Sequence, residues 1–134
     1  MKRDELEAFQ FKHLKHILNH AYNNSEHYRN SFRDAGVSPN DINSLSDIQK
    51  LPTIQKDNIR KDQELTPPLG KMTAVPVSEV VYISVSSGST GMPTASPFTY
   101  QDFEDFMDFE ARLFYSSGMR KNDRYCHALN MSLF

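Results

Sequence analysis

Apolar and polar positions alternate along the chain with two different periods. Between residues 3 and 23 apolar side chains recur every three or four positions, which predicts one long amphipathic helix. Ser25 suits the N-cap of a second helix over residues 26–35, and Gly36 suits its left-handed C-cap. The stripe of the first helix is interrupted only by Gln10 and consists of Leu6, Leu14, Ile17, Leu18, Ala21 and Tyr22.

The next stretch predicts short helices and a stiff connection. Residues 46–51 predict a short helix that Pro52 ends. Thr53 is then placed to cap another helix over residues 54–61. Residues 66–70 read Thr-Pro-Pro-Leu-Gly, a composition typical of a connector rather than of a regular element.

Beyond the connector the period changes to that of strands. Residues 80–85 are dense in β-branched and aromatic side chains and give the clearest strand signal. A weaker strand follows over residues 95–98, where Pro97 favours an edge position. Apolar residues at helical spacing predict a long helix over residues 100–117. Residues 125–129 predict a final strand.

Together these elements predict an α/β protein with three parts. We expect a helical N-terminal segment over residues 1–64 and a proline-rich connector over residues 65–78. Strands and a helix are expected over residues 79–134. The sequence therefore predicts that the chain changes architecture once, near its middle.

Composition narrows the class of protein. The 134 residues carry a formal net charge of −2, which provides no basic field for nucleic acid or for an anionic membrane surface. The N-terminus is charged rather than apolar, so no signal peptide is predicted, and no apolar run is long enough for a membrane span. We expect a cytoplasmic protein whose partners are small molecules.

Residues 86–94 read Ser-Ser-Gly-Ser-Thr-Gly-Met-Pro-Thr and follow the first strand directly. Phosphates are bound best by many short donors that converge on a small volume, which backbone amides near glycine and small hydroxyls supply. Met92 after Gly91 excludes the lysine of a Walker A loop, and no Gly-x-Gly-x-x-Gly fingerprint occurs. The segment indicates a nucleotide-phosphate loop, with a polar surface turn as the alternative.

The same nine residues resemble the Ser/Thr-Ser-Gly-Ser/Thr-Thr-Gly-x-Pro-Lys/Thr signature of adenylate-forming enzymes. Their Pro-Thr ending resembles the phenylacetate–coenzyme A (CoA) ligase branch. Residues 14–29 are similar to the opening helix pair of that branch, and residues 51–60 to its Leu-Pro-x-x-x-Lys-x-x-x-Arg stretch. The resemblance covers essentially the whole chain, with shorter matches at residues 35–37, 67–70 and 74–76.

The resemblance implies that residues 79–134 begin a large AMP-binding domain. It also implies a two-step reaction: ATP and a carboxylic acid, expected to be an aryl acid, give an acyl-adenylate, and the CoA thiol then displaces AMP. Mg²⁺ is the implied metal cofactor. The loop would hold the β- and γ-phosphates through Ser86, Ser87, Gly88, Ser89, Thr90 and Gly91, with Thr94 at the variable last position.

The adenine- and ribose-binding motifs of the family, its metal-coordinating glutamate and its C-terminal lysine domain have no counterpart in this sequence. We therefore expect the chain to be cut short, to contain no catalytic residue and to be inactive alone. The alternative is a non-catalytic nucleotide-binding or interaction module derived from the family. In a chain that is cut short, the Phe-rich helix over residues 100–117 would expose an apolar face, and a homodimer is one expected assembly.

Further candidates lie at the two ends of the chain. His13, His16 and His20 share one helix face, for which we expect structural or surface roles and keep a zinc site as the alternative. Cys126 is expected to be a buried small apolar residue, and no metal site is predicted. In the resembling family the stretch after the final strand lines the acid pocket. Its candidates here, with plain core packing as the alternative, are Leu129, Asn130, Met131 and Phe134.

Overall fold

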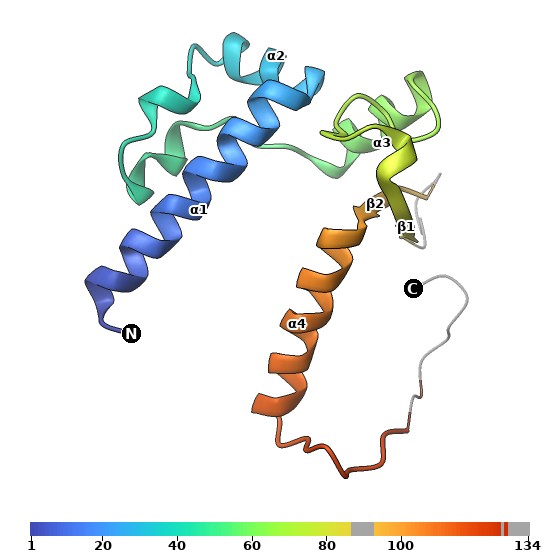
Figure 1. The fold of residues 1–134 in the computed structure, drawn as a ribbon. Coiled ribbons are helices and arrows are strands. Elements are labelled where there is room, and N and C mark those ends of the chain that lie inside the picture. Colours follow the sequence, from blue (N-terminus) through green and yellow to red (C-terminus); the bar gives the residue numbers. More distant parts are fainter. Residues whose placement is uncertain (87–92, 127, 129–134) are drawn as a thin grey trace. The chain divides into compact units, whose positions relative to one another are not determined.

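A computed structural model describes residues 1–86, 93–126 and 128 of the chain (Figure 1). The chain divides into two compact units, residues 1–75 (unit 1) and 76–134 (unit 2). A helical N-terminal part is followed by a two-stranded sheet and a helix, as the sequence predicts. The elements are α1 (Arg3–Asn24), α2 (Glu26–Asp34), η1 (Pro39–Asp41), η2 (Leu45–Lys50), α3 (Lys56–Leu65), η3 (Val77–Glu79), β1 (Val80–Val85), β2 (Ala95–Thr99) and α4 (Tyr100–Ser116).

The core of unit 1 lies where α2 and the following segment fold back on α1 (Figure 1). Leu6 and Ile17, which belong to the predicted apolar stripe, are 38% and 54% exposed, whereas Phe11 packs on the core. Both faces have helical spacing, so the partners that cover α1 decide which one is buried. The buried cluster is Leu18, Phe32, Val37 and Ile42, and around it pack Phe11, Leu14, Tyr22, Tyr28 and Leu51.

Ser25 joins α1 to α2 and is fully buried. Its Oγ accepts the N–H of Tyr28 at 3.4 Å, which confirms the predicted N-cap. The same hydroxyl donates to the carbonyl oxygen of Lys71 at 3.0 Å. One side chain therefore caps α2 and also satisfies a carbonyl far along the chain.

Replacing Ser25 by alanine should lower the free energy of unfolding by about 1–2 kcal/mol, because the cap and the bond to the Lys71 carbonyl are both lost. Chemical denaturation followed by circular dichroism measures the change. Ser78→Ala, at an exposed serine of η3, is the matched control and should stay within about 0.5 kcal/mol of the parent. Equal effects of the two substitutions would contradict the role given to Ser25.

Two short 3-10 helices begin in the same way, with a serine followed three residues later by an aspartate. Asp41 Oδ2 accepts from the hydroxyl and the backbone N–H of Ser38 at 2.6 and 2.8 Å, and these bonds lower the pKa of Asp41. The pKa of Asp47 is also held well below its ordinary value, first by Lys50 and then by backbone N–H and hydroxyl donors. Ionised carboxylates thus stabilise both helix starts.

The helix predicted over residues 54–61 instead runs from Lys56 to Leu65, so Thr53 as its cap is wrong. Gln55 holds the N-cap position, and its backbone N–H donates to Asn58 Oδ1 at 2.8 Å. The side chain of Asn58 therefore sets the start of α3 from inside the helix, a signal that a search for Ser or Thr caps passes over.

A carboxylate ties α3 to the segment that follows it. Asp62 Oδ2 accepts the backbone N–H groups of Lys71 and Met72 at 2.7 and 3.0 Å. The chain reaches this position through Gly70, whose φ of +79° is a left-handed conformation that glycine adopts without strain. Leu69, the residue before this glycine, is buried and only 4% exposed.

In unit 2, β1 and β2 form an antiparallel hairpin. The pairing runs from Val85 opposite Ala95 to Val80 opposite Thr99, with an irregularity between Val80 and Tyr82. Both strands lie as the sequence predicts, apart from one added residue at the end of β2. The sheet has two strands among the described residues, which accommodates a proline in β2.

Aromatic rings join the hairpin to α4. The ring of Tyr82 lies 5.9 Å from that of Phe98 and 5.6 Å from that of Phe103, and Phe98 lies 6.1 Å from Phe106. Thr99 caps α4, as predicted. The start of α4 is therefore fixed to the hairpin both by its cap and by ring packing.

The segment after α4 differs from the prediction of a final strand over residues 125–129. Tyr125, Cys126 and Ala128 are not in a strand, and a strand needs a neighbour to pair with. Cys126 is exposed, so its predicted burial is wrong. Apolar side chains on α4 are also exposed, by 37–62%: Phe106, Met107, Phe109, Leu113 and Phe114.

Candidate functional site

The predicted phosphate loop is the connection between the two strands of the hairpin. Val85 and Ala95 are paired in the register, so the strands bring Ser86 and Thr94 together at the base of the loop. The structure describes Ser86, Pro93 and Thr94 of the nine predicted positions. The remaining six positions lie outside the described part of the chain and are Ser87, Gly88, Ser89, Thr90, Gly91 and Met92.

Three hydrogen bonds connect the two residues at the base of the loop. The N–H of Ser86 donates to the carbonyl oxygen of Thr94 at 3.0 Å, and the N–H of Thr94 donates to Ser86 Oγ at 3.2 Å. The two hydroxyl oxygens lie 2.8 Å apart, at hydrogen-bond distance. Thr94 is only 7% exposed. The two ends of the loop are therefore held side by side.

Charge is absent from the sequence of the whole hairpin. Residues 80–99 include no Asp, Glu, Lys, Arg or His. Phosphate recognition by this segment would depend on neutral hydroxyls and backbone N–H groups, which bind anions through oriented dipoles rather than through a formal charge. A requirement for charge compensation would have to be met from outside the hairpin.

The structure provides no geometry for the residues that are predicted to line the acid pocket. Leu129, Asn130, Met131 and Phe134 all lie outside the described residues. Ahead of them, Tyr125 packs its ring against Phe114 with centroids 5.7 Å apart. The pocket prediction therefore stays a prediction.

Two of the three histidines of α1 contact neighbouring side chains. His13 packs on Phe9 with ring centroids 4.3 Å apart, and His20 Nδ1 lies 3.2 Å from Asn24 Nδ2. The same Nδ2 also donates to the carbonyl oxygen of His20 at 2.9 Å. Among the described residues no three or more His, Cys, Asp or Glu side chains are placed to hold a metal ion.

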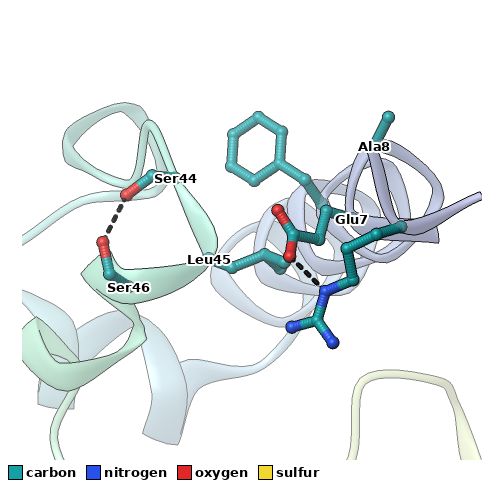
Figure 2. A pocket seen from close by; sticks show the side chains of 7 residues that line it. Glu7, Ala8, Ser44, Leu45 and Ser46 are labelled. Carbon is teal, nitrogen blue, oxygen red and sulfur yellow. Dashed lines mark hydrogen bonds and ion pairs between the residues drawn. The ribbon is translucent and has the colours of Figure 1, made fainter. Parts of the chain in front are cut away.

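Two surface pockets in unit 1 escaped sequence reasoning. One, of about 520 Å³, lies between the first turns of α1 and η2, with the Arg3–Glu7 ion pair (2.6 Å) and the Ser44–Ser46 hydroxyl pair (2.8 Å) at its sides (Figure 2). The other, of about 300 Å³, is lined by apolar side chains of α1 and α2 and by His20. Both pockets are formed by segments that are distant in sequence, so no local sequence motif predicts them.

No family profile matches the chain. Over 98% of its length it is 39% identical to a phenylacetate-coenzyme A ligase of Aromatoleum evansii and 37% identical to that of Escherichia coli (strain K12). The corresponding protein of Thermus thermophilus is 31% identical over all 134 residues. The chain spans 29% of the length of each of these curated relatives.

Solved structures give the same result. A 2-hydroxyisobutyryl-CoA ligase in complex with 2-HIB-AMP and CoA superposes with a TM-score of 0.85 at 29% identity, over 92% of this chain and 26% of that one. The same enzyme in the postadenylation state with R3-HIB-AMP gives a TM-score of 0.84 at 27% identity. No helix among the described residues is both long and apolar enough to cross a membrane. The predicted resemblance is confirmed: over nearly its whole length this chain is similar to phenylacetate–CoA ligases and to a CoA ligase of known structure, and it spans less than a third of their length.

Proposed function

We propose that this chain contributes the phosphate-binding part of an enzyme that activates a carboxylic acid, expected to be an aryl acid, with ATP and transfers it to CoA. The observation that carries the proposal is the Ser/Thr/Gly segment of the family signature, held at both ends by an antiparallel hairpin. Similarity to phenylacetate–CoA ligases over nearly the whole chain supports the choice of reaction.

In this proposal the loop holds the leaving pyrophosphate. Donors fixed in advance around the β- and γ-phosphates stabilise the negative charge that grows as the acid carboxylate attacks the α-phosphate. The CoA thiol then attacks the carbonyl carbon of the acyl-adenylate and releases AMP. Residues 1–64 form a helical N-terminal segment, residues 65–78 connect it, and residues 79–134 begin the AMP-binding domain.

Mg²⁺, when bound, would neutralise phosphate charge. The described residues offer no cluster of acidic side chains for it, and residues 80–99 contain no carboxylate at all. The part of the chain that the structure describes does not fit this metal, so no step is assigned to it. The proposed partners are ATP, the acid and CoA, in the cytoplasm; a homodimer through the exposed side of α4 stays a prediction.

The proposal is tested by binding and turnover together. The chain should bind ATP, measured by isothermal titration calorimetry. The double substitution Ser87→Ala with Ser89→Ala should weaken binding at least about tenfold, since each hydrogen bond to a charged phosphate contributes about 1.5–3 kcal/mol. Ser96→Ala, at an exposed serine of β2, is the matched control and should bind as the parent does.

Turnover should need the parts of the relatives that this chain does not cover. Incubation of the chain with ATP, Mg²⁺, phenylacetate and CoA should release no pyrophosphate above the blank. Clear turnover would contradict the dependence on further domains. Binding of ATP that is unchanged in the double variant would instead contradict the role of the loop.

A further inference from the structure

Ser86 and Thr94, the first and last residues of the predicted phosphate loop, use their polar groups on each other. Ser86 Oγ accepts the N–H of Thr94 at 3.2 Å and lies 2.8 Å from Thr94 Oγ1. A hydroxyl has one donor and two acceptor positions, so most of the capacity of Ser86 Oγ is already used. Thr94 is one of two buried polar residues among the described ones, at 7% exposure.

We propose that Ser86 and Thr94 form a latch that positions the phosphate loop and that neither side chain is itself a phosphate contact. This inference rests on the proposed function, because it concerns the same loop. The latch comprises the two side chains and the backbone bond from the Ser86 N–H to the Thr94 carbonyl oxygen at 3.0 Å. It assigns positioning roles to two residues that the family signature alone would count among the phosphate ligands.

The latch follows from how a short loop binds an anion. A loop whose ends can separate must be ordered when the ligand arrives, and that ordering opposes binding. A side-chain bond across the base, one residue beyond the Val85–Ala95 pair, fixes the separation of the ends before ATP binds.

Position 94 distinguishes a latch from a phosphate contact. The signature allows lysine or threonine there, and a lysine contacting phosphate would add a favourable charge. In this chain the site is buried, and residues 80–99 contain no carboxylate that could pair with an ammonium group. A lysine at this position would therefore break the hydroxyl bond at the base of the loop. Its positive charge would not make up for the affinity for ATP that is lost.

The test compares three substitutions at Thr94 by the affinity of the chain for ATP. Thr94→Val keeps the shape, removes the hydroxyl and should weaken binding about tenfold, whereas Thr94→Ser keeps the hydroxyl and should stay within about twofold. Thr94→Lys should also bind more weakly than the parent. Tighter binding by Thr94→Lys, or unchanged binding by Thr94→Val, would overturn the latch.

Amide hydrogen exchange without ATP separates the latch from the proposed function. Ser86→Ala removes the acceptor of the residue 94 N–H, so that amide should exchange at least about tenfold faster, while Ser96→Ala should leave it unchanged. If ATP binds and the exchange rates do not differ, the latch is wrong and the proposed function stands. If the parent chain binds no ATP, the proposed function fails. Ser86 and Thr94 then position no phosphate loop, even if the exchange rates show that their hydrogen bond exists.

Discussion

Replacing Ile42 by alanine is expected to lower the free energy of unfolding of unit 1 by about 2–5 kcal/mol. Ile42 is fully buried and packs in one cluster with Leu18, Phe32 and Val37. Removal of its outer methyl and methylene groups loses their transfer free energy and leaves a cavity. The carbonyl oxygen of Ile42 also accepts from Lys15 Nζ at 3.2 Å, so the backbone around it cannot easily collapse into the space.

Urea denaturation followed by circular dichroism measures this change, with Ile48→Ala as the matched control. Ile48 is 53% exposed in η2, six residues along the same segment, and its truncation should cost well under half as much. If the two variants lose equal stability, the core of unit 1 does not lie where Ile42 places it.

Gly70→Ala should lower the free energy of unfolding by about 3 kcal/mol. A Cβ at this position would lie 2.1 Å from Asp62 Oδ2 and 3.2 Å from the Asp62 backbone carbon. The carboxylate would have to leave the N–H groups of Lys71 and Met72, and a side chain at φ +79° adds about 1–2 kcal/mol of strain.

Gly36→Ala is the control for that substitution. Gly36 also has a left-handed φ, +66°, but a Cβ there would have no heavy atom within 4 Å. Its variant should lose only the part that comes from backbone strain, about 1–2 kcal/mol. The difference between the two alanine variants, measured by thermal unfolding, therefore reports the contact between Gly70 and Asp62. A difference of zero would show that the carboxylate moves at no cost.

Much of the secondary structure was predictable because its signals are local. The Ser25 cap, the left-handed Gly36 and the β-branched run of β1 each depend on a few neighbouring residues. The features that the sequence did not predict depend instead on contacts with residues distant along the chain. α1 lies where the sequence predicts, but α2 and Ile42 decide which of its apolar residues are buried. The described residues of the predicted final strand are not in a strand, because a strand needs a neighbouring edge.

The candidate site divides in the same way. The composition of residues 86–94 predicts phosphate binding, and the resemblance to the family signature indicates the reaction that is proposed. The bond between the hydroxyls of Ser86 and Thr94 could not be read from the sequence, since it arises only when antiparallel pairing brings residues eight positions apart together. The sequence identified candidate hydrogen-bond donors to phosphate. The structure shows that two of them, Ser86 and Thr94, are hydrogen-bonded to each other.

The aromatic packing of the two units has a spectroscopic consequence. The chain has six tyrosines and no tryptophan. Tyr22 stacks on Phe32 in unit 1, with ring centroids 6.0 Å apart, and Tyr82 lies against Phe98 and Phe103 in unit 2. Each unit thus holds a tyrosine in an asymmetric environment of phenyl rings, so near-ultraviolet dichroism can follow the melting of either unit without a dominant indole band.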